Sequence, residues 1–182
     1  MGARARAGGA SPLWIALFTA ASTATTLALA CATPFPSLAA LAAVHMRRRD
    51  GIALMLAAWL ASQAVGLLVL GYPRTAETWC WGAGLGSAVI VALLGADAAL
   101  RWSGGARTAT RLALAYGGGF VAFKLVILVW ALFIGGVATA LAPALLAEQL
   151  LRNGAILIGL YGLYRGLVAL GIPPARPARA AA

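Results

Sequence analysis

The chain has 182 residues, of which 63% are hydrophobic and 10% are charged, and its mean hydropathy is +0.92. A soluble domain carries about 25% charged residues, so this composition excludes an ordinary water-soluble domain. It predicts an all-α, polytopic membrane protein with about six transmembrane helices, each of about 20 residues.

The charge is strongly basic, with 14 Lys and Arg against 4 Asp and Glu, which gives a net charge of +10. No polar segment interleaves aromatic and basic residues, so nucleic acid is not an expected partner. Arginines in the cytoplasmic loops of a membrane protein explain the charge directly. The expected partners are the lipid bilayer and other membrane protein subunits.

Six hydrophobic stretches follow one another along the chain: Pro12–Cys31, Pro36–Met46, Gly51–Gly71, Thr78–Leu100, Leu112–Gly135 and Asn153–Ile172. A weaker stretch, Val137–Leu151, contains Pro143 and Glu148 and is predicted to lie as a helix at one surface. We expect a single helical bundle over residues 12–172, with a flexible N-terminus over 1–11 and a flexible tail over 173–182.

The first stretch has two interpretations. Its basic start, apolar centre and small-residue end resemble a signal peptide, but its apolar run is long enough to span a bilayer. Ala16, Ala20 and Ala24 recur at four-residue spacing and form a small-residue face, which is suited to close packing against another helix. We therefore predict a first span whose alanine face docks a partner.

The second stretch decides the topology. If Pro36–Met46 crosses back, ten arginines lie on one side of the membrane: Arg4, Arg6, Arg47, Arg48, Arg49, Arg101, Arg107, Arg111, Arg176 and Arg179. The other side then holds only Arg74 and Arg152. Because cytoplasmic loops are enriched in Lys and Arg, this asymmetry favours a crossing, with both termini in the cytoplasm of a bacterium and the bundle in its inner membrane.

The helix after Pro36 is short for a crossing. Its apolar part extends about 16 Å at about 1.5 Å per residue, against about 30 Å of hydrocarbon. Residues 33–36 must then complete the crossing as extended chain, which neighbouring helices have to shield. The alternative is an ordinary tight turn between two spans.

Lys124 lies near the centre of the stretch Leu112–Gly135. A lysine at that depth costs at least about 2.5 to 3.5 kcal/mol, and such residues usually face a cavity or a partner. We predict that Lys124 binds ligand in a cavity reached from the outer side. The alternatives are snorkelling to a membrane surface and a structural pair with Asp97.

Gln63 is also central in its stretch and shares a helix face with Trp59, four residues earlier. It is a candidate for an interhelical hydrogen bond or a ligand contact. Trp81 lies among aromatic residues at the outer ends of two spans, either in the interfacial belt or at a pocket mouth. Tyr161 in the last span is deep enough to line a pocket. The predicted ligand-binding residues are Lys124, Gln63, Trp59, Trp81 and Tyr161.

No catalytic constellation is present in the sequence. The single His45 adjoins an arginine run, no two carboxylates share a helical spacing, and the two cysteines lack metal-ligand spacing. No enzyme activity, metal or cofactor is predicted.

Cys31 and Cys80 are both expected near the outer surface, as free thiols or as a disulfide. Gly117, Gly118 and Gly119 are expected to permit close helix contact.

The stretch "TPFPSLAALAAVHMRRRDGIALMLAAWLASQAVGLLVLGYP", which follows a first helix with repeated alanines, resembles the S-components of energy-coupling-factor transporters. The resemblance covers residues 12–100. It implies a six-helix protein that binds a vitamin-like or metal-containing solute and docks through Ala16, Ala20 and Ala24 onto coupling subunits. Gln63 and Lys124 match no motif of that family, so it implies no particular ligand.

A second class of function explains the small-residue faces equally well. In a structural or accessory subunit of a larger membrane complex, Lys124 is an interhelical anchor and no pocket is needed. The two hypotheses differ in one observable feature, which is whether Lys124 lines an outward-facing cavity or a protein-packed seam.

Overall fold

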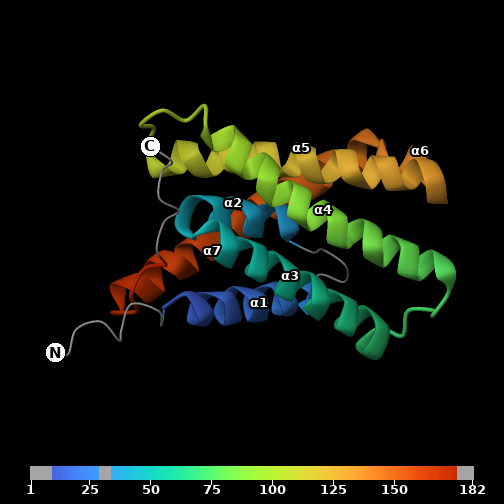
Figure 1. The fold of residues 1–182 in the computed structure, drawn as a ribbon, viewed down its shortest axis with the longest axis horizontal. Coiled ribbons are helices and arrows are strands. Elements are labelled where there is room, and N and C mark those ends of the chain that lie inside the picture. Colours follow the sequence, from blue (N-terminus) through green and yellow to red (C-terminus); the bar gives the residue numbers. More distant parts are fainter. Residues whose placement is uncertain (1–9, 29–33, 176–182) are drawn as a thin grey trace.

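The computed structural model describes residues 10–28 and 34–175. Within these ranges the protein is all-α, with seven α-helices and one π-helical segment: α1 (Ala10–Ala28), α2 (Phe35–His45), α3 (Arg48–Ala64), η1 (Val65–Val69), α4 (Ala76–Leu100), α5 (Thr108–Ile134), α6 (Val137–Ala140) and α7 (Pro143–Ala169). The long helices run side by side along the longest axis of the molecule (Figure 1).

Helix α2 occupies the centre of this bundle. It contacts α3, α4, α5 and α7, and every residue from Phe35 to Val44 is buried. Pro36 stands at the start of the helix, where a missing amide proton costs nothing. The structure confirms a short helix, 11 residues long, that neighbouring helices cover on all sides.

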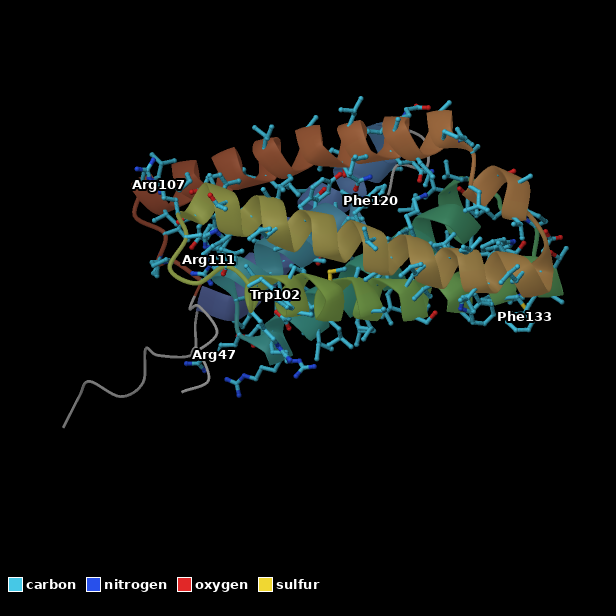
Figure 2. The ribbon with its side chains drawn as sticks, turned by 90° about the horizontal axis from the view of Figure 1, so that it is seen from above. Arg47, Trp102, Arg107, Arg111, Phe120 and Phe133 are labelled. Carbon is cyan, nitrogen blue, oxygen red and sulfur yellow. The ribbon has the colours of Figure 1, made fainter. Side chains whose placement is uncertain are left out.

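The direction of α2 returns the chain to the arginine-rich end. Arg47 lies at the same end of the molecule as Arg107 and Arg111, and Phe133 lies at the opposite end (Figure 2). Arg48 pairs with Asp97 at the end of α4, with 3.9 Å between nitrogen and oxygen. The short second helix therefore brings the Arg47–Arg49 turn beside the α4–α5 connection, as the asymmetry of arginines predicts.

The expected number of six spans is wrong for the described residues. Three helical segments are long and apolar enough to cross a membrane: Arg48–Val69, Ala76–Leu100 and Thr108–Ile134. Helix α2 is too short, α1 is diluted by serine and threonine, and the first half of α7 carries Glu148 and Arg152. The apolar pattern alone overestimated how many helices are both long and apolar enough to cross a membrane.

The prediction of a separate surface helix over Val137–Leu151 is also wrong. Only Val137–Ala140 forms a helical turn of its own, and Pro143 then begins a continuous helix of 27 residues. Proline is favoured in the first turn of a helix, and no further proline follows before the helix ends at Ala169. An ion pair between Glu148 and Arg152, one turn apart, supports the helix where a break was expected.

Helices α4 and α5 form the closest helix pair through glycine. A Cβ added at Gly118 would lie 2.7 Å from the carbonyl oxygen of Gly95 and 2.6 Å from the Cβ of Ala99. Gly119 lies over the carbonyl oxygen of Ala92 in the same way, at 3.2 Å, whereas a Cβ at Gly117 would meet nothing within 4 Å. The predicted close contact is confirmed for two of the three glycines.

Helix α1 is attached by aromatic residues. Trp14 packs on Tyr164 of α7 with 4.7 Å between ring centroids and donates a hydrogen bond to the carbonyl oxygen of Pro173 at 2.9 Å. Its alanines Ala16, Ala20 and Ala24 all lie on the exposed side of α1. The predicted small-residue face is therefore uncovered in the isolated chain.

Candidate functional site

A cavity of about 380 Å³ lies between α3, α4, α5 and α7. It contains three of the five predicted ligand-binding residues, Lys124, Gln63 and Trp81, together with Leu70 and Tyr72 from the α3–α4 connection. That connection lies at the end of the bundle opposite the α4–α5 connection (Figure 1), which carries Arg101 and Arg107. The cavity therefore extends to the arginine-poor end, which is the end predicted to face outward.

Lys124 projects from α5 toward α7. Its ammonium donates a hydrogen bond to Oε1 of Gln149 and lies 5.8 Å from the centroid of the Phe120 ring, within the range of a cation–π contact. Phe120 lies between the two helices in Figure 2. The alternative pairing with Asp97 is not formed, because Asp97 pairs with Arg48 at the other end of α4. Lys124 thus has polar and aromatic neighbours and still lines open space.

Gln63 and Trp59 both point toward Gly82 of α4. The indole nitrogen of Trp59 donates to the carbonyl oxygen of Gly82 at 3.0 Å, and a Cβ at Gly82 would lie 2.9 Å from Oε1 of Gln63. The Gln63 amide donates to Ser62 of its own helix at 3.3 Å. Trp59 is therefore a packing residue beside the cavity rather than part of its lining, and Gln63 keeps its amide at the cavity wall.

The π-helical segment η1 shapes the cavity mouth and is absent from the sequence-based prediction. Gly66, inside this segment, lies directly under the Tyr72 ring, because a Cβ there would meet two ring carbons at 2.8 Å. Both residues line the cavity. Single-turn π-bulges occur frequently at functional sites, and here the bulge lets Tyr72 fold back over the end of α3.

Helix α7 contributes the residues that sequence reasoning missed, Gln149, Arg152 and Asn153. They were assigned to a surface helix or to a span boundary, although their spacing of three and four residues places them on one face of a helix. Asn153 is buried, and its backbone oxygen accepts a hydrogen bond of 2.7 Å from Ser37 in α2. This bond fixes the polar face of α7 toward the cavity.

Tyr161 lies elsewhere. It stacks on His45 with 5.8 Å between ring centroids and lines a separate, smaller cavity near the arginine-rich end.

Cys80 is exposed with a free thiol; Cys31 lies outside the described residues. Among the described residues, no group of three or more His, Cys, Asp or Glu side chains is placed to hold a metal ion.

The electrostatic character of the cavity is cationic. Lys124 and Arg152 both line it, and no acidic side chain is among its lining residues. Glu148 pairs with Arg152 from the exposed surface of α7, so Arg152 is partly neutralised and Lys124 is not. Amide groups of Gln63, Gln149 and Asn153 surround the charge. The arrangement can accept a carboxylate or another small anionic group.

Comparisons with protein-family models, with curated proteins and with solved structures found no match to this chain. Fold and site therefore define the class of protein by themselves. It is a helical protein with three candidate membrane spans among its described residues and a cationic, amide-lined cavity between these spans and α7.

Proposed function

We propose that this protein is a membrane subunit that binds a small anionic organic solute in the Lys124 cavity, in the manner of a transporter S-component. The observation that carries the proposal is the lining of the cavity, where Lys124 meets an open space of about 380 Å³ with no acidic neighbour in its wall. This volume lies within the range of about 300 to 1,000 Å³ that is typical of small-molecule sites.

The arrangement of charge supports an orientation. The arginine-rich end belongs in the cytoplasm of a bacterial inner membrane by the positive-inside rule. The cavity mouth at Leu70 and Tyr72 then faces the outer side, from which a solute enters. A vitamin-like carboxylate fits the cationic wall better than a metal complex held by protein ligands.

The exposed alanine face of α1 supports the proposal that a partner subunit docks on this helix. A small-residue face is suited to close helix packing, and Ala16, Ala20 and Ala24 are all exposed on α1. The chain shows no phosphate-binding loop for an ATPase, so transport requires coupling subunits that dock on this face. The proposal makes the protein a binding component rather than an enzyme.

One observation favours the alternative of a structural or accessory subunit. The ammonium of Lys124 already bonds to Gln149, so it links α5 to α7 without any ligand. In that case the cavity is a by-product of the link, and the alanine face binds a neighbouring chain of a larger complex.

Thermal unfolding in detergent distinguishes the solute-binding subunit from the accessory subunit. Purified protein is titrated with a panel of carboxylate-bearing vitamins, each paired with its neutral amide analogue. A ligand that binds only the folded state raises the unfolding temperature with concentration. We expect at least one carboxylate to stabilise the wild type and to lose this effect in Lys124→Met. Arg74→Gln, which removes an exposed charge outside the cavity, is the matched control.

The proposal fails if no carboxylate stabilises the wild type more than Lys124→Met. Loss of a neighbouring chain on Lys124→Met, with no ligand effect, identifies the accessory subunit instead. Orientation is tested separately by cysteine labelling of Arg48→Cys in intact cells, in a background where both native cysteines, Cys31 and Cys80, are replaced by serine. Efficient reaction of this single thiol with an impermeant reagent from outside reverses the topology.

A further inference from the structure

A second polar cavity lies at the arginine-rich end, apart from the Lys124 cavity. It has a volume of about 310 Å³, and its lining includes His45, Thr108, Tyr161, Tyr164 and Arg165. These residues come from α2, α5 and α7, so three helices enclose it. No acidic side chain is among its lining residues.

Two buried nitrogens in this region have no hydrogen-bond partner among the described residues. They are Nε2 of His45, in the cavity wall, and Nε of Arg111, one turn into α5. Burial, together with the charges of Arg111 and Arg165, lowers the pKa of His45 to about 4. Buried polar groups are normally paired, so these nitrogens indicate a missing partner, and the surrounding positive charge indicates that the partner is an anion.

The backbone adds to this preference. Helix α5 begins at Thr108, which lines the cavity, and no side chain caps its first turn. The free amide groups and the positive end of the helix dipole favour an anion at this position.

An apolar groove begins where the polar cavity ends. It lies between α5 and α7, has a volume of about 660 Å³, and runs from Ala109 and Leu112 to Leu150 and Leu151. Tyr161 lines both the groove and the polar cavity. A cationic pocket thus adjoins an apolar groove along two helices, one of which is a candidate membrane span.

We infer that this composite site binds an anionic glycerophospholipid, with its phosphate in the His45–Arg165 cavity and an acyl chain in the α5–α7 groove. Basic pockets between membrane helices are known sites for acidic headgroups. A free phosphate satisfies only the polar half of the site, and a partner helix satisfies only the apolar half. The continuity of the two halves through Tyr161 favours the lipid.

The test is native mass spectrometry of delipidated protein in detergent, with three probes: palmitoyl-oleoyl phosphatidylglycerol, palmitoyl-oleoyl phosphatidylcholine and glycerol 3-phosphate. We expect phosphatidylglycerol to be retained most strongly. Arg165→Gln should weaken that retention about fivefold, the effect of one arginine near an anionic headgroup. Arg74→Gln, at the opposite end, should leave it unchanged.

A second variant tests the apolar half without touching the charge. Ala155→Trp fills the groove at an exposed position that lines it, and should lower phosphatidylglycerol retention severalfold. Ala83→Trp, at an exposed position on α4 outside the groove, is the matched control. Circular dichroism melts establish that each variant retains the fold.

Several results overturn the inference. Equal retention of the two lipids excludes recognition of the acidic headgroup, and unchanged retention in both test variants excludes this location. Glycerol 3-phosphate competing at the same concentration as the lipid reduces the site to a phosphate pocket. A lipid-free dimer that Ala155→Trp dissociates identifies a second copy of the chain as the occupant.

Discussion

Helix α5 faces two very different neighbours. Toward α4 it packs so closely that a Cβ added at Gly118 would meet the carbonyl oxygen of Gly95, and one added at Gly119 would meet that of Ala92. Toward α7 it is separated by cavities that side chains bridge, with Lys124 bonded to Gln149 and the Tyr116 hydroxyl donating to the carbonyl oxygen of Leu150 at 2.5 Å.

The difference shows how one helix can serve both stability and binding. Small residues at the Gly95–Gly118 contact let α4 and α5 gain dispersion contacts at close range, which are a main source of helix association in lipid. Long side chains between α5 and α7 hold that pair apart and leave room for ligands. We expect the two interfaces to respond in opposite ways to added volume.

The largest expected effect is at the glycine interface. Gly118→Ala places a methyl group 2.7 Å from the carbonyl oxygen of Gly95, and relief requires a backbone shift. Overpacking of this kind costs up to about 3 kcal/mol. Gly117→Ala, one residue earlier on the open side of α5, should be neutral or stabilising by up to about 1 kcal/mol. Unfolding in detergent compares the two, and equal stability would show that the helices are free to separate.

The next effect concerns the attachment of α7. Ser37→Ala removes the hydrogen bond from the α2 hydroxyl to the backbone oxygen of Asn153 and leaves that oxygen buried without this donor. We expect a loss of about 2 kcal/mol. Thr23→Ala, which removes a bond of 2.9 Å to Thr19 within α1, is the control and should cost less than half as much. A smaller loss for Ser37→Ala would mean that other contacts fix α7.

The third prediction concerns how folding stability depends on pH through His45, which lies in the cavity at the arginine-rich end. The unfolded His45 side chain has a pKa of 6.5, and folding lowers the pKa to about 4 through burial and the charges of Arg111 and Arg165. Between these values the unfolded state binds more protons, so folding stability is lost as pH falls from 6.5 toward 4. After discounting for partial exposure, the loss is about 1 to 2 kcal/mol. His45→Gln should flatten the dependence in this window; an unchanged slope would assign it to other groups.

The smallest expected effect is at the bridge across the gap. Tyr116→Phe removes the hydroxyl that bonds to Leu150 and should cost about 1 kcal/mol. The same change should leave the α4–α5 interface unaltered, so Gly118→Ala combined with Tyr116→Phe should show additive losses. Strong coupling between the two would contradict the independence of the two faces of α5.

Much of the fold was accessible from the sequence. The short helix after Pro36, its return to the arginine-rich end and the glycine contact on α5 all follow from apolar length, arginine placement and small residues, and the structure confirms them. Hydropathy was less informative about helix ends. It divided α7 at Arg152, where the helix in fact continues from Pro143 to Ala169 and Arg152 pairs with Glu148.

The sequence predicted only part of the candidate site. Lys124, Gln63 and Trp81 stand out because polar and aromatic residues are conspicuous in apolar stretches, and the structure brings them to one cavity. Gln149 and Arg152 lie in a segment whose polarity looked like surface. Tyr161 was assigned by depth alone, and depth does not determine which side of a helix a residue occupies.

The central position of α2 has a consequence for how the chain assembles. The four helices that α2 contacts most, α3, α4, α5 and α7, follow it in the sequence. Synthesis from the N-terminus therefore produces α2 before these helices exist, and its Ser37 hydroxyl meets Asn153 only after 116 further residues. The contact between α7 and α2 can therefore form only after all three candidate spans have been synthesised.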